Sequence, residues 1–189
     1  RLLTFNTDAI SDVQVTTGTV DASTPLGSGA VINVSTKSGT DQLRGIAGIV
    51  YTPRSWNGNN AGAGTVRFNE ILQPDLSLGG PILKGKAWFY GAYRHTRQYS
   101  GLGRTPSQVA LLTALNPSFK PFDNSVLSHN YYVKGTAQIS PQHQVVAFWE
   151  RDLHPETGDR EWYTEPLSVS GQGGTGIGVR LQSIWGSTL

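Results

Sequence analysis

The strongest constraint on the fold is the stretch His129–Ser140, in which the side chains alternate with a period of two residues. Strict alternation of this kind is typical of a β-strand with two different faces, because successive side chains point to opposite sides. One face would hold Tyr131, Val133, Gly135, Ala137 and Ile139, and the other Tyr132, Lys134, Thr136, Gln138 and Ser140. The stretch therefore predicts a long strand whose sheet separates an apolar environment from a more polar one.

Similar extended stretches recur along the chain. Val145–Asp152 follows after only Pro141–Gln144, a link short enough to make an antiparallel hairpin. The other expected strands are Leu43–Thr52, Leu76–Gly80, Ala87–Gln98 and Gly178–Leu189. Helix is expected only over Ser107–Leu115, between Pro106 and Asn116-Pro117. The predicted fold class is all-β, an antiparallel meander of about six strands.

The links between these strands alternate in length. Pro81–Lys86 and Pro141–Gln144 are tight, whereas the links over residues 53–73, 100–127 and 153–177 each exceed twenty residues. A meander with this alternation has its tight turns on one rim and its long loops on the other, as transmembrane β-barrels do. Strands of about ten residues also match the length that a tilted strand needs to cross a bilayer.

The alternating pattern alone fits two environments. It is expected for a barrel wall with lipid outside and a wet lumen inside. It is equally expected for a soluble antiparallel sheet with one face on a core. The loop asymmetry and the aromatic residues near strand ends favour the membrane; these aromatics are Trp88, Tyr131, Trp149 and Trp185.

Composition excludes several classes of protein. The chain has no Cys, which excludes disulfide scaffolds, thiolate metal sites and thiol catalysis. No apolar run approaches the roughly 20 residues of a membrane-spanning helix. The chain also begins at Arg1 and contains no Met. We therefore expect a processed product or a part of a longer protein.

The charge is unevenly distributed. Residues 43–105 hold eight basic residues against Glu70 and Asp75, while the flanking segments 1–42 and 106–189 are each net −2. A basic middle segment with several aromatics is one feature of nucleic-acid-binding surfaces. Here the basic residues are dispersed without any cluster, so no nucleic-acid partner is expected.

Two glycine patterns imitate nucleotide-binding motifs. Gly171-x-Gly173-x-x-Gly176 has the spacing of a dinucleotide fingerprint, but a strand rather than a helix is expected to follow it. Gly80-x-x-x-x-Gly85-Lys86 has the spacing of a phosphate-binding loop, but Ala87 replaces the hydroxyl residue. A loop and a tight hairpin explain these patterns better, and no cofactor is expected.

No arrangement of residues predicts catalysis. The four histidines, His95, His129, His143 and His154, show no metal-site spacing. An acidic group that includes Asp152, Glu156, Asp159, Glu161 and Glu165 has oxygen ligands for a hard cation, although Arg151 and Arg160 lie within it. No Gly-x-Ser-x-Gly nucleophile motif occurs. We expect no enzyme and assign no metal ligands, and cation binding by the acidic group stays open.

Four segments resemble one known family. They are Ala9–Gly18 (AISDVQVTTG), Gly29–Thr40 (GAVINVSTKSGT), Leu76–Ile82 (LSLGGPI) and Trp88–Tyr93 (WFYGAY). In this order they resemble the plug end and early barrel strands of TonB-dependent outer-membrane receptors. The resemblance is greatest to the Oar-like group, whose members often carry a carboxypeptidase-regulatory-like domain.

This resemblance implies a domain organisation and a function. Residues 1–42 would be the C-terminal part of a plug domain, and 43–189 the first strands of a transmembrane barrel of roughly twenty-two strands. The whole receptor would take up a large solute across the outer membrane of a Gram-negative bacterium, with energy supplied through the TonB complex. The TonB-contacting segment would lie upstream of Arg1, and six strands do not close such a barrel.

The resemblance and the alternation together predict which residues face which environment. The lumen is expected to receive Arg94, Lys134, Thr136, Gln138 and Arg180. Outer-membrane lipid or its interface is expected to receive Tyr131, Val133, Ala137, Ile139 and Trp185. The alternative from another class is a soluble β-sandwich that binds carbohydrate or acts as an adhesin, in which exposed aromatics stack on sugar rings.

Overall fold

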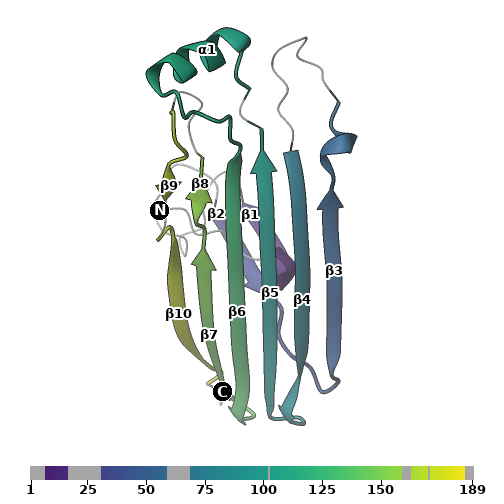
Figure 1. Ribbon diagram of the computed structural model, residues 1–189. Helices are drawn as coiled ribbons and strands as arrows, with labels where there is room; N and C mark the ends of the chain where they lie inside the picture. The colour runs from purple at the N-terminus through teal and green to yellow at the C-terminus, as the bar shows by residue number, and fades with distance from the viewer. Residues whose placement is uncertain are drawn as a thin grey trace.

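A computed structural model describes residues 7–16, 31–58, 69–101, 103–158, 163–169 and 171–185 of the chain (Figure 1). Most of these residues form one antiparallel sheet with the strand order β10-β7-β6-β5-β4-β3. Its long strands are β3 (Arg44–Thr52), β4 (Asn69–Leu83), β5 (Ala87–Ser100), β6 (Asn124–Ser140), β7 (His143–Leu153) and β10 (Gly173–Ser183). Neighbours in sequence are neighbours in this sheet, so the predicted all-β meander is confirmed.

A separate β-hairpin lies behind the central strands of the sheet (Figure 1). It consists of β1 (Ile10–Thr16) and β2 (Val31–Thr36), which pair only with each other, and the short helix η1 (Thr7–Ala9) precedes it. The chain then passes to the lower end of the sheet, where β3 begins (Figure 1).

The two ends of the sheet are built differently. Lys84–Lys86 turns β4 into β5, and Pro141-Gln142 turns β6 into β7, both at the lower end in Figure 1. The longer connections lie at the upper end, with helices η2 (Arg54–Trp56) and α1 (Pro106–Leu115) and the two-residue strands β8 (Glu156–Thr157) and β9 (Ser168–Val169). The predicted one-sided loops and the predicted helix are confirmed.

Several strand bounds differ from those expected. Strand β4 begins at Asn69 rather than near Leu76, and β10 covers Gly173–Ser183 rather than Gly178–Leu189. Backbone pairing continues past the alternating segments, for example from Ser100 to Asn124 between β5 and β6. Because hydrogen bonding rather than hydropathy sets a strand's end, the connections are shorter than predicted.

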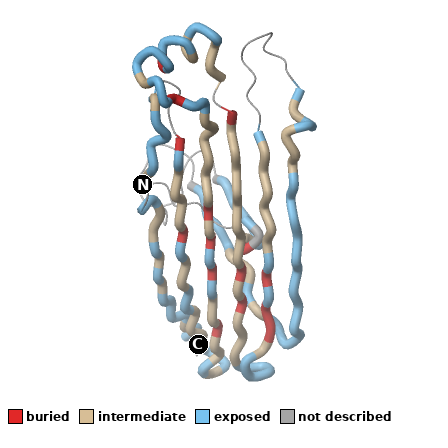
Figure 2. The backbone as a smooth tube through the Cα atoms, viewed as in Figure 1, coloured by how far each residue is buried: buried red, intermediate tan, exposed pale blue. Residues whose placement is uncertain are grey.

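Register assigns each side chain to a face, because residues directly opposite across a ladder share one side of the sheet. One face turns toward the hairpin, and its buried cluster contains Ala9, Tyr90, Ala92 and Tyr132. Figure 2 shows the buried residues gathered on the central strands rather than on the edge strands. The sheet therefore packs on the hairpin through its middle.

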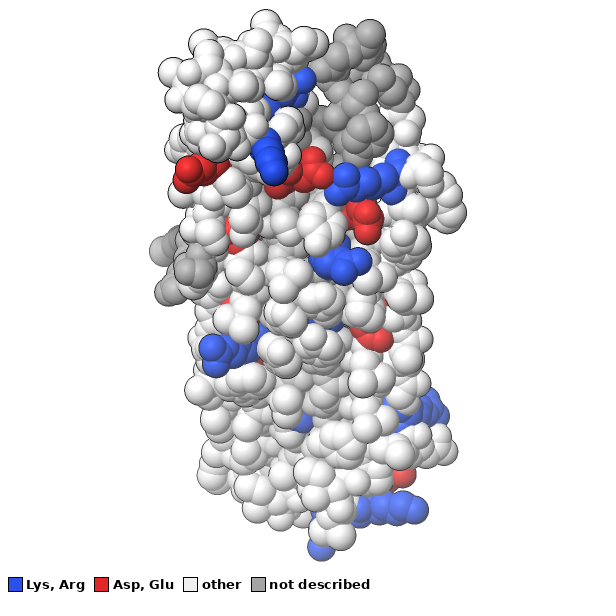
Figure 3. All heavy atoms as spheres, viewed as in Figure 1, with Lys and Arg blue, Asp and Glu red and all other residues white. Residues whose placement is uncertain are grey.

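The opposite face, called the outward face below, carries many exposed apolar side chains. They include Ile49, Leu76, Leu78, Val133, Ile177, Val179 and Leu181. Figure 3 shows this face mostly white, with single Lys, Arg, Asp and Glu side chains scattered between its upper and lower ends. None of the helices in the described part of the chain is long and apolar enough to cross a membrane.

The connection between β5 and β6 has a small core of its own. Thr105 caps α1 by accepting from the backbone N–H of Gln108, whose side chain accepts in return from the Thr105 N–H. Leu112 is only 1% exposed, and Phe119, seven residues later, is buried as well. This connection is therefore a folded element rather than an irregular loop.

Candidate functional site

The hairpin and the sheet are joined through polar side chains on the hairpin-facing side of β6. The Tyr132 hydroxyl donates to Thr36 Oγ1 at 2.8 Å. Lys134 Nζ donates to the Thr36 backbone oxygen and to its hydroxyl, each at 3.0 Å. One residue at the end of β2 thus accepts hydrogen bonds from two residues of the sheet wall.

A second polar contact joins the start of the hairpin to β5. Arg94 Nη1 donates to Thr7 Oγ1 at 2.8 Å. Arg94 lies directly across from Asn130 of β6 and from Asp75 of β4. The two contacts attach both the entry and the exit of the hairpin to the central strands.

A cavity of about 560 Å³ lies between the hairpin and the strands β6, β7 and β10. Its lining is mixed: Ile10 and Val34 come from the hairpin, while Lys134, Glu150 and Arg180 come from the wall. A second hollow of about 430 Å³ shares Lys134 and Arg180 with it. The space beside the hairpin therefore presents charged groups of both signs to anything that enters it.

Glycines on β10 leave room for the wall side chains that line this cavity. A Cβ at Gly178 would lie 2.2 Å from the Phe148 ring, and one at Gly176 would lie 2.5 Å from Glu150 Oε1. Both side chains thus lie flat over the neighbouring strand instead of filling the space toward the hairpin. The glycines help to keep the cavity open.

The segment that leads from the hairpin to β3 is fixed to the turn between β4 and β5. Asp41 Oδ1 accepts from the Gly85 backbone N–H at 2.8 Å and from the Trp88 indole N–H at 2.7 Å. These two donors, with Lys84 nearby, hold the pKa of the Asp41 carboxyl below its ordinary value. Asp41 therefore accepts these two hydrogen bonds as a charged carboxylate.

Gly39 is the second fixed point of the same junction. A Cβ at this position would lie 2.2 Å from the Phe89 backbone oxygen and 2.8 Å from that of Gly80. Both oxygens belong to strands of the sheet, so only glycine allows this approach. The junction segment, defined as residues 37–43, therefore lies in direct backbone contact with the wall.

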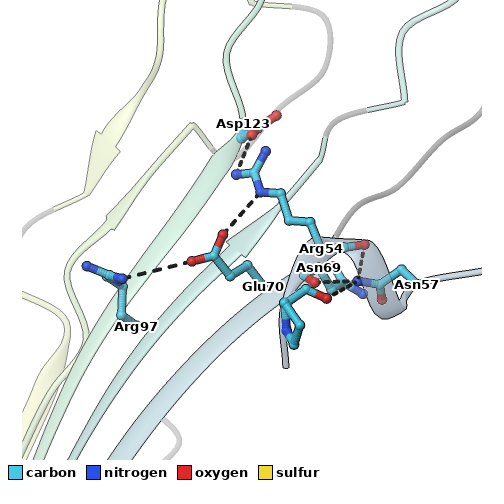
Figure 4. Close-up of polar contacts among 7 residues, drawn as sticks. Arg54, Asn57, Asn69, Glu70, Arg97 and Asp123 are labelled. Atoms are coloured by element: carbon cyan, nitrogen blue, oxygen red, sulfur yellow. Dashed lines mark hydrogen bonds and ion pairs between the residues drawn. The ribbon is translucent and has the colours of Figure 1, made fainter. Parts of the chain in front are cut away.

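A network of charged residues lies at the opposite, upper end of the sheet (Figure 4). Arg54 pairs with Asp123 at 2.9 Å and with Glu70 at 3.4 Å, and Arg97 approaches Glu70 at 3.9 Å. The guanidinium groups of both arginines also lie near the Tyr99 ring, at 5.8 and 5.6 Å from its centroid. This network joins the ends of β4 and β5 to the loop after β3.

Comparison with curated proteins finds one that shares this sequence pattern. It is the TonB-dependent transporter Oar of Myxococcus xanthus, which is 32% identical over 108 residues. The chain resembles a TonB-dependent transporter. The aligned part is 49% of this chain and 10% of the relative, so the chain spans about a tenth of that transporter. The resemblance expected from the sequence motifs is confirmed at this level.

Two other comparisons give no match. No family model matches the chain. No solved structure matches it either. The similarity to TonB-dependent transporters therefore rests on the match to this one relative, which is named as a transporter.

The residues expected to face a transporter lumen all lie on the hairpin-facing side. Lys134 and Arg94 contact the hairpin directly, as described above. Thr136 lies in one row with Val146 and Arg180. Gln138 pairs with Gln144 near the lower turn, where the side chains hydrogen-bond at 3.3 Å.

The residues expected to face lipid lie on the outward face where the register defines it. Tyr131, Val133 and Ala137 share this face, and Val133 is 51% exposed. Ile139 is an exposed residue at the irregularity between Gln138 and Ser140, outside the regular register. Trp185 lies beyond the end of β10, and its ring is 5.8 Å from that of His143.

Trp88 is the second residue of β5 and lies near a strand end as predicted, whereas Tyr131 lies in the middle of β6. The sequence groups it with Tyr131, Trp149 and Trp185 as aromatics near strand ends. In the structure it pairs with Thr136 on the hairpin-facing side. Its indole donates to Asp41, so it supports the junction, whereas Tyr131 and Trp149 lie on the outward face.

A polar chain of four residues was missed by the sequence reasoning. Asn130 Nδ2 donates to Asp152 Oδ1 at 2.6 Å, the other Asp152 oxygen contacts His154 Nε2, and His154 Nδ1 lies 2.8 Å from Ser128 Oγ. The order Ser, His, Asp matches a hydrolytic triad. However, Ser128 is only 7% exposed within a strand, so the chain is better explained as a bridge between β6 and β7.

The register between β6 and β7 explains why these hydrogen-bonded residues were not predicted from the sequence. Ser128 and His154 come together because β6 and β7 pair with His129 opposite Leu153. The link that the sequence suggests, Pro141–Gln144, is longer than the turn that forms. A register built from that link would place these residues out of contact.

The other candidate motifs also have structural assignments. Gly173 and Gly176 lie within β10, so this part of the glycine pattern is strand rather than the expected loop, and the Gly80–Lys86 pattern covers the end of β4 and the turn to β5. Of the acidic group, Asp159 and Glu161 lie outside the described residues. Within the described ranges, no group of three or more His, Asp or Glu is placed to hold a metal ion.

Proposed function

We propose that this chain forms the plug-to-barrel junction of a TonB-dependent outer-membrane receptor. Residues 1–42 would be the C-terminal part of its plug domain, and 43–189 the first strands of its transmembrane barrel. The whole receptor would import a large solute through the outer membrane of a Gram-negative bacterium. TonB would supply the energy by acting on a plug region upstream of the hairpin.

The observation that carries this proposal is the difference between the two faces of the sheet. The hairpin packs by hydrogen bonds on the polar face, through Thr36 and Thr7. The outward face is apolar and open, with Ile49 67% and Ile177 75% exposed. A barrel wall between a plug and lipid requires a polar inner face and an apolar outer face, because lipid solvates apolar side chains and a lumen solvates polar ones.

The edges of the sheet agree with a larger barrel. Among the described strands, β3 pairs only with β4, and β10 pairs only with β7. Unpaired backbone groups at such edges are costly in a bilayer. Further strands would pair with β3 and β10, so that Lys134 and Arg180 face an enclosed lumen.

The soluble β-sandwich is less compatible with the observed layers. A sandwich buries the apolar face of one sheet against a second sheet. Within the described parts of the chain, the only other sheet is the β1–β2 hairpin, and it lies on the polar side. The sugar-binding alternative therefore lacks the layer that would cover Leu76 and Val179.

Nitroxide labels on adjacent residues of β10 test the proposal. The chain has no cysteine, so Leu181→Cys and Gln182→Cys each create one labelling site on opposite faces. In outer membranes, the label at 181 should collide mainly with oxygen and the label at 182 mainly with a water-soluble nickel complex. Gln142→Cys at the exposed turn serves as the aqueous control. Equal nickel accessibility at 181 and 182 would refute the proposed faces.

A further inference from the structure

The cavity beside the hairpin has an acidic end and a basic end. Glu150 and Arg180 both line it. Gly176 is the β10 residue opposite Glu150, and Arg180 lies four positions further along the same strand. At about 3.3 Å of rise per residue, these two β10 positions are roughly 13 Å apart. The Glu150 carboxylate lies over Gly176, where an added Cβ would be 2.5 Å from its Oε1, so the two charges face one space from separate ends.

The charges at these two ends do not neutralise each other. The ion pairs found among the described residues include neither Glu150 nor Arg180, and Arg180 is exposed. Lys134 lies between the two ends, opposite Phe148. Its ammonium group carries three N–H donors, of which at most two are used by Thr36. The lining therefore retains the capacity to bind a ligand that carries both a positive and a negative charge.

An aromatic ring forms the floor of the cavity between the two ends. The Phe148 ring covers Gly178, where an added Cβ would lie 2.2 Å from it, and Gly178 is midway between Gly176 and Arg180. The Phe148 residue is 37% exposed, and its ring stacks against that of Tyr132 at 6.3 Å between centroids. A ring that is held in this way offers apolar contact area at a low entropic cost. The middle of the cavity therefore favours an apolar group.

A short peptide with free ends has the groups that this arrangement would bind. Its N-terminal ammonium would pair with Glu150, and its C-terminal carboxylate would accept two hydrogen bonds from the planar Arg180 guanidinium. An extended chain spans about 3.3–3.6 Å per residue, so about four residues cover the distance between the two ends. The volume of about 560 Å³ is also within the range of cavities that hold small ligands.

We propose that Glu150, Phe148 and Arg180 form a binding site for a zwitterionic peptide of about four residues with apolar side chains. This inference rests on the proposed function, because a solute reaches the polar face of the wall through the lumen. The peptide ends bind Glu150 and Arg180, a central side chain packs on the Phe148 ring, and Lys134 donates its remaining N–H to a backbone oxygen of the peptide.

Binding of one tetrapeptide in three chemical forms tests the site. The probes are alanyl-leucyl-phenylalanyl-alanine with free ends, its N-acetylated form and its C-amidated form. Their affinities are measured by isothermal titration calorimetry on the protein purified from its own outer membrane in a neutral detergent. The peptide with free ends should bind about tenfold more tightly than either blocked form, because each block removes a charge-assisted hydrogen bond.

Two variants assign each end of the peptide to one residue. Glu150→Gln should remove the preference for a free N-terminus and retain the preference for a free C-terminus, and Arg180→Gln should do the reverse. Each preference is a ratio of affinities within one variant, so a general loss of affinity does not affect it. Lys84→Gln is the control, since it removes a positive charge from the exposed lower turn and should retain both preferences.

Three outcomes would overturn the peptide site. They are equal affinities for the three forms, no binding of any form, and unchanged preferences in Glu150→Gln and Arg180→Gln. Loss of either preference in Lys84→Gln would show that the overall charge of the protein selects the peptide, and would also refute the site. Because the nitroxide experiment on β10 measures the orientation of the wall independently, failure here can be distinguished from failure of the proposed function.

Discussion

The ammonium group of Lys134 reaches both the backbone oxygen and the hydroxyl of Thr36, at 3.0 Å in each case and across 98 residues of sequence. A single side chain of the wall thereby holds the last residue of the hairpin. Thr36 is the last paired residue of β2, opposite Ile10 of β1, so Lys134 holds the hairpin at the end of its own ladder. Release of this contact is a necessary part of any movement of the hairpin away from β6.

Lys134→Met is predicted to loosen the hairpin without unfolding the sheet. Methionine keeps most of the chain length but removes hydrogen bonds from a charged donor, which contribute about 1.5–3 kcal/mol. Amide hydrogen exchange in Val31–Thr36 should therefore accelerate roughly ten- to hundredfold. Lys86→Met, at the exposed turn, should leave it unchanged. Equal exchange in Lys134→Met and the unmodified protein would show that the contact does not hold the hairpin.

The contacts of Asp41 with Gly85 and Trp88 are predicted to weaken when the pH falls. Its pKa is lowered by the Gly85 N–H and the Trp88 indole N–H, from an ordinary value of 3.8. A carboxyl with a lowered pKa contributes stability that is complete above the ordinary value and is lost as pH falls through the lowered one. The Trp88 indole proton resonance should therefore titrate with a midpoint below 3.8.

Asp41→Asn provides the control for that titration. The amide oxygen still accepts both hydrogen bonds but carries no charge to protonate. The Trp88 indole resonance of this variant should stay constant over the acid range in which the unmodified protein changes. A midpoint at or above 3.8, or an identical titration in the variant, would remove Asp41 as the cause.

Gly39→Ala is predicted to destabilise the junction strongly. The added Cβ would lie 2.2 Å from the Phe89 backbone oxygen, and neither strand backbone can move without breaking its ladder. Overpacking of this kind costs about 1–3 kcal/mol, which should lower the midpoint of urea unfolding in detergent. Gly135→Ala is the matched control, because nothing lies within 4 Å of its added Cβ. Equal midpoints for the two variants would refute a tight junction at Gly39.

Alternation and turn residues predicted most of the sheet, because both are local signals. The face of each residue in His129–Ser140 follows from a period of two, and the Lys84–Lys86 turn follows from glycine beside lysines. Gly85 indeed has a positive φ of 71°, which glycine adopts without strain. The positions of the strand ends were predicted less accurately, since polar residues such as Asn69 extend a strand beyond its alternating segment.

The contacts of the candidate site were not predictable in the same way. Thr36 meets Lys134, and Asp41 meets Trp88, through packing between the hairpin and the sheet rather than through any local pattern. The resemblance to the receptor family predicted that a plug end precedes the barrel strands. It did not predict which residues of the hairpin contact which residues of the sheet. The Ser128 and His154 contact depends on a turn two residues long, and a small error in that length abolishes it.

The folded connection between β5 and β6 leads to the last prediction. The Arg104 guanidinium lies 4.4 Å from the Phe122 ring centroid, and its Nη1 donates to the Phe122 backbone oxygen at 2.8 Å. Arg104→Lys loses the planar stacking surface and the fork of donors while it keeps the charge. Exchange of the amides in α1 and at Phe119 should accelerate about tenfold, in line with roughly 1–2 kcal/mol for a partly desolvated cation–π contact.

The same variant should leave the sheet intact, because Arg104 lies in the connection and not in a strand. Amide exchange in β5 and β6 should therefore match that of the unmodified protein. Lys120→Gln, at an exposed position of the same connection, should change neither region. Unchanged exchange in α1 would show that the stacking does not stabilise the helix. Acceleration throughout β5 and β6 would show instead that the connection folds as one unit with the wall.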